Sequence, residues 1–376
     1  MDSKEHKDKL RQTVLEYMEP SFRFHLSLHL PALRSVEKRT PLNIKYLHLT
    51  DNAIYMNKAK FEIKIDRKYE IEEPPFRRNW PVDYDVDAFG FQTNTKCIMM
   101  KGDVCMENNS AMCMETSERL MEAMKGKEPS ECRYTLKLKY VTEHRMPSDY
   151  RSSRITKIYE GMKVLIGSIF GNRTAVWNVD TMIISTGNVR WIWREYGEKP
   201  LVRNIKLRRY QSVNLDGLKL ICHEASFPLK MLNFEMDTTI LDHETVANAE
   251  YLIVRLEWFR EDANSLNLLM KISNQKIQVN RISLNTVASL TGFWLKHGRP
   301  VGTSWSFEVQ LAAREEPSRF IKNLKRNARA IASGRGSIEM SMGPYSFLSI
   351  SYDNQILYDP VNQQDIWMVK MEVLHR

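Results

Sequence analysis

The sequence of 376 residues predicts an α+β protein, with a short N-terminal head of three helices followed by mixed sheets and a few helices. Prolines divide the first forty residues into short amphipathic segments, each of which fits a helix. From residue 43 onward, alternating apolar and polar residues recur in short runs typical of half-buried strands. A composition of 43% hydrophobic and 27% charged residues is that of a folded globular chain.

The head is expected to contain helices over 10–18, over 21–30 and from Pro31 onward. Pro20 ends the first helix and, like Pro31, suits the first turn of the helix that follows. Each helix places its apolar residues on one side: Leu10, Val14, Tyr17 and Met18, then Phe22, Leu26 and Leu30, then Leu33 and Val36.

A small sheet and an irregular, methionine-rich insert should follow the head. Strands are predicted at 43–49, 54–56, 61–65 and 133–141, and a short helix at 117–124 inside the insert. A long amphipathic helix is predicted over 151–170, with strands at 175–184 and 189–193. The polar stretch near residue 145 suggests three domains: a head over 1–40, a β-rich domain over 41–145 and an α+β domain over 146–376.

Five short runs between 200 and 284 share an apolar-xx-apolar-x-apolar pattern, and they are 201–207, 215–221, 229–234, 251–256 and 279–284. Four of them start at intervals that suit a degenerate leucine-rich repeat. A chain this rich in apolar residues produces about that many runs by chance, so the repeat interpretation depends on the spacing alone.

The C-terminal part should begin with a helix over 285–296, capped by Asn285 and ended by Gly298. A strand over 301–309, a basic helix over 318–331 and strands over 337–374 follow, with a hairpin turn at Asp353-Asn354.

Composition and motifs argue against an enzyme. The sequence contains no phosphate-binding loop, no nucleophile elbow and no paired zinc ligands, so we expect no catalytic residue, no cofactor and no metal. Asp83, Asp85 and Asp87 lack the glycine and glutamate of a calcium loop, and are expected to form a solvated edge. Five cysteines, an odd number, and the absence of a long apolar segment favour the cytosol or nucleus.

A net charge of +9 leaves nucleic-acid binding open as an alternative function. Basic residues gather in two places, and Trp191 and Trp193 lie close enough in sequence to the first group to stack on bases. The first group is Lys206, Arg208 and Arg209, and the second is Arg319, Lys322, Lys325, Arg326 and Arg329. The ordinary interpretation is a buried tryptophan pair and a solvated helix face.

The N-terminal pattern resembles an F-box, a three-helix module of about forty residues. Apolar residues stand where that module expects them: Val14, Leu15, Met18, Pro20, Leu26, Leu28 and Pro31. The runs TVLEYMEP (13–20), PLNIKYLHL (41–49) and YDVDAFGF (84–91) are similar to the F-box C family that is expanded in nematodes. The segment over 287–309 is similar to the F-box-associated regions of related families.

The resemblance implies a substrate-recruiting subunit of a cullin–RING ubiquitin ligase. The head would bind the F-box-binding adaptor through Val14, Leu15, Met18, Pro20, Leu26 and Pro31, and the C-terminal domain would select an unknown protein target. No membrane contact is expected. Lys9-Leu10 stands where the module usually opens with Leu-Pro, so a degenerate member without a ligase partner is a second alternative.

Overall fold

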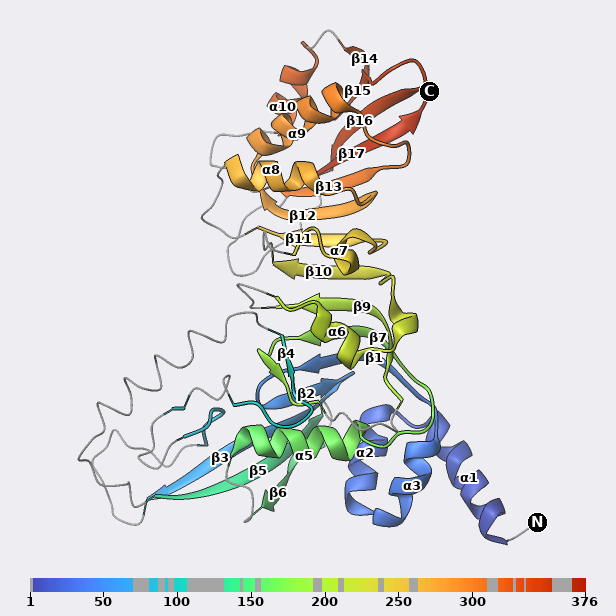
Figure 1. The fold of residues 1–376 in the computed structure, drawn as a ribbon, viewed down its shortest axis with the longest axis vertical. Helices are drawn as coiled ribbons and strands as arrows, with labels where there is room; N and C mark the ends of the chain where they lie inside the picture. Colours follow the sequence, from blue (N-terminus) through green and yellow to red (C-terminus); the bar gives the residue numbers. More distant parts are fainter. Residues whose placement is uncertain are drawn as a thin grey trace. The chain divides into compact units, whose positions relative to one another are not determined.

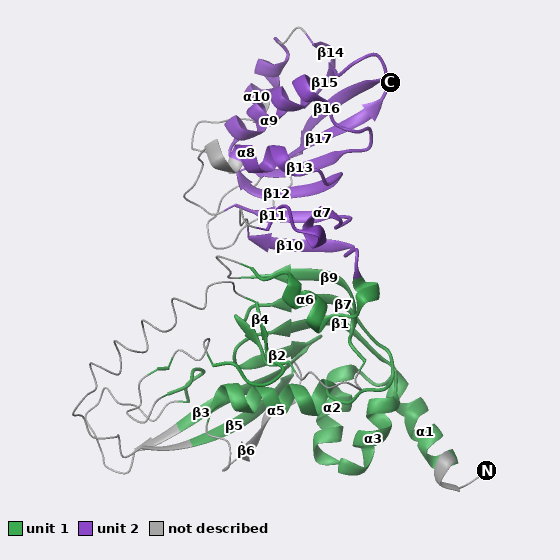
Figure 2. Cartoon of the chain, in the orientation of Figure 1, with its two compact units in different colours: residues 1–226 green, residues 227–376 purple. Residues whose placement is uncertain are grey.

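The computed structural model describes most of the chain, and its architecture is α+β, as predicted. The described residues are 3–69, 81–86, 92–93, 98–106, 132–142, 145–152, 157–191, 198–208, 213–235, 240–256, 263–309, 317–326, 329–334, 336–353 and 367–376. The chain forms two compact units, Met1–Ser226 and Phe227–Arg376 (Figure 2). The domain boundaries expected at 40 and 145 stay predictions.

Unit 1 begins with the three predicted helices, α1 (Ser3–Tyr17), α2 (Pro20–His29) and α3 (Pro31–Arg39). Proline opens α2 and α3, where the backbone N–H that it lacks would have no partner within the helix. The predicted inner face of α2 is wrong. Its buried residues are Ser21, Arg23, Phe24 and Ser27.

The α2 error has a physical cause. Apolar periodicity points to Phe22, Leu26 and Leu30, of which the first two are half-buried and Leu30 is exposed. The helix is instead turned by Phe24, which packs edge-on against Phe170, and by Arg23, which is neutralised by Glu37. A buried ion pair cannot be recognised from one helix alone.

The sheet of unit 1 combines parallel and antiparallel pairing. Its strand order is β9-β7-β1-β2-β3-β5-β6 (Figure 1). Strand β1 lies parallel to β7, and β7 parallel to β9, whereas the pairings from β1 to β6 are antiparallel. The strands are β1 (Leu42–Leu49), β2 (Ala53–Met56), β3 (Ala59–Tyr69), β5 (Cys132–Thr142), β6 (Arg145–Ser152), β7 (Trp177–Ile184) and β9 (Leu201–Leu207). The predicted strands at 43–49, 54–56, 61–65, 133–141 and 175–184 are therefore confirmed.

Smaller elements complete unit 1. Two short strands, β4 (Val104–Cys105) and β8 (Asn188–Val189), form a second sheet. Helix α6 (Asp216–Ile221) and the 3-10 turn η2 (Glu224–Ser226) follow β9. The predicted strand at 215–221 is wrong, because Leu215, Leu218 and Ile221 are spaced to share a helix face as well as to fit the repeat pattern, and all three are buried.

Helix α5 (Ile158–Phe170) lies beside β3 (Figure 1). Gly161 allows this close approach, since a Cβ there would lie 3.1 Å from side-chain carbons of both Ile63 and Leu136. The predicted start at 151 is wrong, because 145–152 pairs with β5 as β6. The true start is set by Asp85, whose carboxylate accepts the N–H of Ile158 at 2.5 Å.

The prediction that Asp83, Asp85 and Asp87 form a solvated edge is wrong for Asp85. It is 3% exposed and does not lie on a solvated edge. Burial raises the pKa of its carboxyl, and hydrogen bonds from the α5 N-terminus oppose that shift. Asp83 is exposed, and Asp87 lies outside the described residues.

Unit 2 contains a second mixed sheet with helices in the crossovers. Its strand order is β14-β15-β16-β17-β13-β12-β11-β10, with β10 to β13 parallel and β13 to β14 antiparallel. The strands are β10 (Met231–Glu235), β11 (Leu252–Arg255), β12 (Lys276–Ile282), β13 (Ser304–Val309), β14 (Ala330–Ser333), β15 (Ser337–Ser341), β16 (Ser346–Asp353) and β17 (Trp367–His375). The helices are α7 (Glu244–Ala247), α8 (Ala263–Lys271), α9 (Leu284–His297) and α10 (Pro317–Leu324).

The parallel half of unit 2 repeats a strand-and-helix pattern. Strands β10 to β13 pair in parallel in chain order, with one register shift between β12 and β13 at Asn280 and Ile282, and α7, α8 and α9 occupy the three successive connections. Parallel strands joined by helices form successive βαβ units. The degenerate repeat over 200–284 stays a prediction. The core between helices and strands holds Trp294 of α9 edge-on against Trp305 of β13, with ring centroids 5.1 Å apart.

Three local predictions in unit 2 need correction. The side chain that caps α9 belongs to Ser283 and not to Asn285, since Ser283 Oγ accepts the N–H of Thr286 at 3.2 Å. The basic helix ends at Leu324, because 330–333 joins the sheet as β14. The predicted strand at 301–309 begins at Ser304. The predicted helix at 117–124 and the second half of the hairpin at 353–354 lie outside the described residues.

Candidate docking surface on the N-terminal helices

Helix α1 presents an apolar stripe to solvent. Leu10, Val14 and Tyr17, here called the α1 stripe, lie on one face at helical spacing and are 56%, 62% and 88% exposed. Leu15 lies on the opposite face and is 3% exposed, so the helix is held by its other side. Three large apolar residues in a row on an exposed helix are typical of a surface that binds another protein.

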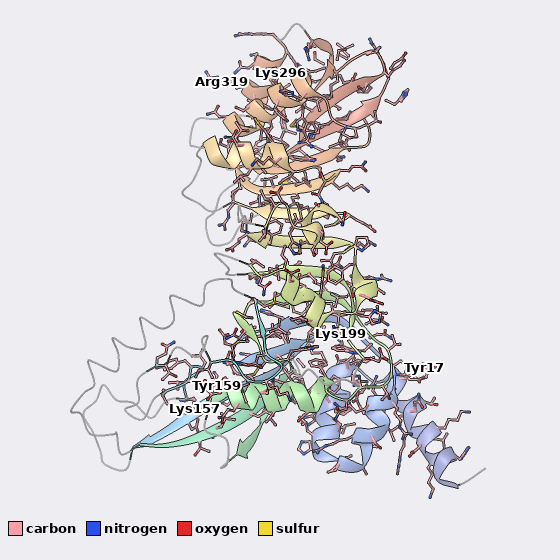
Figure 3. The ribbon with its side chains drawn as sticks, in the orientation of Figure 1. Tyr17, Lys157, Tyr159, Lys199, Lys296 and Arg319 are labelled. Atoms are coloured by element: carbon pink, nitrogen blue, oxygen red, sulfur yellow. The ribbon has the colours of Figure 1, made fainter. Side chains whose placement is uncertain are left out.

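The structure separates the six predicted adaptor-binding residues by exposure. Val14 and Pro31 are exposed, Met18, Pro20 and Leu26 are half-buried, and Leu15 belongs to the core of the head. Tyr17 (labelled in Figure 3) is 88% exposed, against 62% for Val14, but it is absent from the predicted set. Its spacing from Leu10 and Val14 was visible in the sequence. The sequence did not show which side of α1 faces water.

Helix α1 is fastened to α3 by an ion pair as well as by Leu15. The carboxylate of Asp8 accepts a hydrogen bond from Arg39 at 3.1 Å and one from Arg11 at 3.3 Å. Both arginines are about half exposed, so the pairs contribute little stability and serve mainly to orient the helix.

A buried ion network joins the head to the rest of unit 1. Glu37 of α3 is 1% exposed, and its carboxylate accepts hydrogen bonds from Arg23 at 3.1 Å and from Arg173 at 2.8 and 2.9 Å. Arg173 also donates to the backbone oxygens of Glu37 and Thr40, at 2.9 and 2.8 Å. Because Arg173 follows α5, the network links segments 136 residues apart.

Burying the charges of this network costs desolvation free energy, and nearly all of their hydrogen-bonding groups are paired. Burial lowers the pKa of Arg23, and the charge of Glu37 opposes that effect. Among the described residues, the Nε atoms of Arg23 and Arg173 have no hydrogen-bond partner. Among the described residues, Glu37 is the one acidic side chain that forms an ion pair with either arginine, so the position of α3 relative to residue 173 is tightly defined.

Lys38 adds a second fastening next to Glu37. Its ammonium donates to the backbone oxygens of Ser168, Ile169 and Gly171, at 2.8, 3.1 and 2.6 Å, and so caps the C-terminus of α5. Burial lowers the pKa of Lys38 to about 8, and the charge of Glu37 opposes the shift. Three backbone acceptors favour the charged ammonium, so we assign Lys38 a structural role.

An aromatic cluster lies beneath these polar contacts. The ring of Phe170 stacks on Trp177 at 4.9 Å and on Trp191 at 6.1 Å, while Phe24 meets Phe170 edge-on. Trp191 is 6% exposed, so it is not a platform for stacking bases, and Trp193 lies outside the described residues. The α1 stripe is therefore presented by a head with a rigid support.

The described residues contain no group of three acidic, histidine or cysteine side chains placed to hold a metal ion. Within the same residues, no helix is long and apolar enough to cross a membrane.

Comparison with known proteins gives one match. Residues 157–310 match the model of a family described as a domain of unknown function, DUF3557. The matched region runs from the start of α5 to the end of β13, and the head lies outside it. No curated protein and no solved structure matches the chain.

Proposed function

We propose that this protein is a non-catalytic recruiting subunit of a cullin–RING ubiquitin ligase, which docks on the F-box-binding adaptor through its N-terminal helices. The region that matches DUF3557 would then select the protein target. The observation that carries the proposal is the α1 stripe, an exposed apolar face on a helical head that a buried ion network fixes to unit 1.

Burial of the α1 stripe would provide useful affinity. Covering the exposed parts of Leu10, Val14 and Tyr17 would contribute about 1–2 kcal/mol each, from the apolar area removed from water. Because the head is already ordered, little of that energy would be lost in arranging the helix on binding. Together the three residues would contribute about 3–6 kcal/mol. Micromolar binding needs about 8 kcal/mol net, so other residues of the head must add to the contact.

Charges beside the stripe suit an acidic adaptor surface. Lys7, Lys9 and Arg11 are exposed around the stripe on the first turns of α1. Basic residues at the rim of an apolar contact speed up association with an acidic partner and fix its orientation. The predicted residues Pro31, Met18, Pro20 and Leu26 lie on α2, α3 or the α1–α2 turn, and any of them could extend the contact.

The test is a pull-down of the purified adaptor with the full chain, compared with a variant that carries Leu10→Ala, Val14→Ala and Tyr17→Ala. The control carries Thr13→Ala and Glu16→Ala, which are exposed residues on a neighbouring face of the same helix.

We expect retention of the wild-type chain and the control, and loss of at least tenfold in affinity for the stripe variant. Circular dichroism of all three proteins would show that each is folded. If the folded wild-type chain is not retained, the ligase proposal fails, which leaves the nucleic-acid-binding protein and the degenerate family member as the alternatives. Equal retention of the stripe variant and the control would place the adaptor contact elsewhere.

A further inference from the structure

The helices of unit 2 carry an unusual distribution of charge. Unit 2 as a whole is nearly neutral, with 17 Lys and Arg against 16 Asp and Glu. Helices α8, α9 and α10 nevertheless contain no Asp or Glu at all. A solvated helix surface normally carries both acidic and basic side chains. The absence of acidic residues from these three helices therefore calls for an explanation.

Five basic residues on or next to these helices are exposed, and their side chains make no hydrogen bond or ion pair with other described residues. They are Lys271 at the end of α8, Lys296 near the end of α9, Arg319 and Lys322 on α10, and Arg326 just after it. We call them the basic layer. Arg319, Lys322 and Arg326 share one face of α10 and its following turn, opposite the buried Phe320 and Ile321.

Stabilisation of helix ends does not account for the basic layer. Cations near a helix C-terminus can satisfy its last carbonyl groups. Here that task is taken by other residues: Arg299 donates to the backbone oxygens of Met270 and Ile272, at 3.1 and 2.7 Å, and Arg329 donates to that of Leu295. Lys271 and Lys296 are left without such a role.

Hydrogen bonds from Arg299 and Arg329 hold the segments that carry the basic layer close to one another. Arg299 ties the segment after α9 to the end of α8, beside Lys271. Arg329 ties the segment after α10 to the end of α9, beside Lys296. The helices pack in the order α8, α9, α10 (Figure 1), and Lys296 and Arg319 lie on neighbouring helices (Figure 3).

The layer offers charge without apolar anchors. The exposed large apolar side chains of unit 2, among the residues that the structure describes, are Val301, Ile331, Tyr345 and Leu374, and none lies on α8, α9 or α10. A protein partner would need buried apolar anchors for affinity, whereas a phosphate backbone is bound mainly by distributed cations. Arginine and lysine in such a layer would position the backbone without reading base edges.

We propose that the basic layer binds the sugar–phosphate backbone of a nucleic acid, without recognising its base sequence. This function is separate from adaptor docking, which uses helix α1 of unit 1, and neither proposal depends on the other.

The test measures binding of the full chain to a labelled DNA duplex of about 20 base pairs by fluorescence anisotropy, at salt concentrations from about 50 to 200 mM. The variant carries Lys271→Gln, Lys296→Gln, Arg319→Gln and Lys322→Gln. The matched control carries Lys45→Gln, Arg203→Gln, Lys230→Gln and Lys276→Gln, which removes the same number and kinds of exposed cations elsewhere.

A plot of log affinity against log salt concentration should have a slope of about −4 for the wild-type chain. Each phosphate neutralised by the basic layer contributes close to one unit of that slope. The variant should lose about two orders of magnitude in affinity and most of that slope, while the control changes by less than about threefold. A labelled RNA of unrelated sequence should bind with similar salt dependence.

Three results would overturn the proposal. The first is no binding by the folded wild-type chain, and the second is equal loss in the variant and the control, which would indicate a net-charge effect only. The third is tighter binding of polyglutamate than of nucleic acid, which would assign the basic layer to an acidic protein.

Discussion

Replacement of Glu37 by glutamine should strongly destabilise unit 1. Glutamine keeps the shape of the side chain but removes the carboxylate that forms ion pairs with Arg23 and Arg173, which are 2% and 0% exposed. Three hydrogen bonds of 2.8 to 3.1 Å lose their ionic character, and an amide N–H₂ group can face the guanidinium groups. Removal of one partner from a buried ion pair costs about 3–5 kcal/mol.

The assay is urea unfolding followed by tryptophan fluorescence, since Trp177 and Trp191 belong to the aromatic cluster beside the network. For a unit of this size, that free energy corresponds to a fall of about 10 °C in melting temperature. Arg39→Gln is the control, because its exposed pair with Asp8 should cost less than about 1 kcal/mol.

A compensating variant tests the reasoning further. Replacement of Arg23, Glu37 and Arg173 together by methionine removes the buried charges as a group and fills a similar volume. Its unfolding free energy should lie within about 2 kcal/mol of the wild type, or above it. The reasoning would be refuted if Glu37→Gln cost no more than Arg39→Gln, or if the triple replacement were worse than Glu37→Gln alone.

Three further predictions concern local features. Asp85→Ala should cost about 1–2 kcal/mol of stability in urea unfolding, because α5 loses its cap, whereas Asp85→Asn should cost less than half as much; equal costs would contradict the capping role. Gly298→Ala should destabilise α9 by about 1 kcal/mol, because φ is 77° there, while Gly292→Ala, with open space around it, should stabilise α9 by up to about 1 kcal/mol. Burial raises the pKa of Cys222 to about 12, so below pH 9 its thiol stays protonated. Cys222→Ala should leave the number of thiols that react with Ellman's reagent unchanged in native protein at pH 8, and lower it by one in urea.

Local pattern predicted most of the secondary structure. The three head helices, strands β1 to β3, β5 and β7, and helix α9 follow from periodicity and from the positions of Pro20, Pro31 and Gly298. These signals act over a few residues, so one sequence is enough to find them.

The errors arise where distant residues decide the structure. The start of α5 is set by Asp85, which lies 73 residues earlier, and the inner face of α2 by Glu37 and Phe170. Residues 330–333 continue a helical pattern in the sequence, but they form strand β14, which pairs with β15. For the candidate site, helical spacing located the α1 stripe, but only the packing of Leu15 and the rest of the head shows that it faces water.

The contacts of Glu37 and Lys38 with residues 168–173 have a consequence for inheritance. A head separated from Arg173 would keep Arg23 paired with Glu37, but would lose two of the hydrogen bonds of the Glu37 carboxylate and every acceptor of the Lys38 ammonium. Recombination that moved the first forty residues onto another protein would therefore have to supply a matching arginine and helix end. Substitutions in the first forty residues should therefore be accompanied by compensating substitutions in residues 168–173. The head should seldom be exchanged between proteins as a separate module.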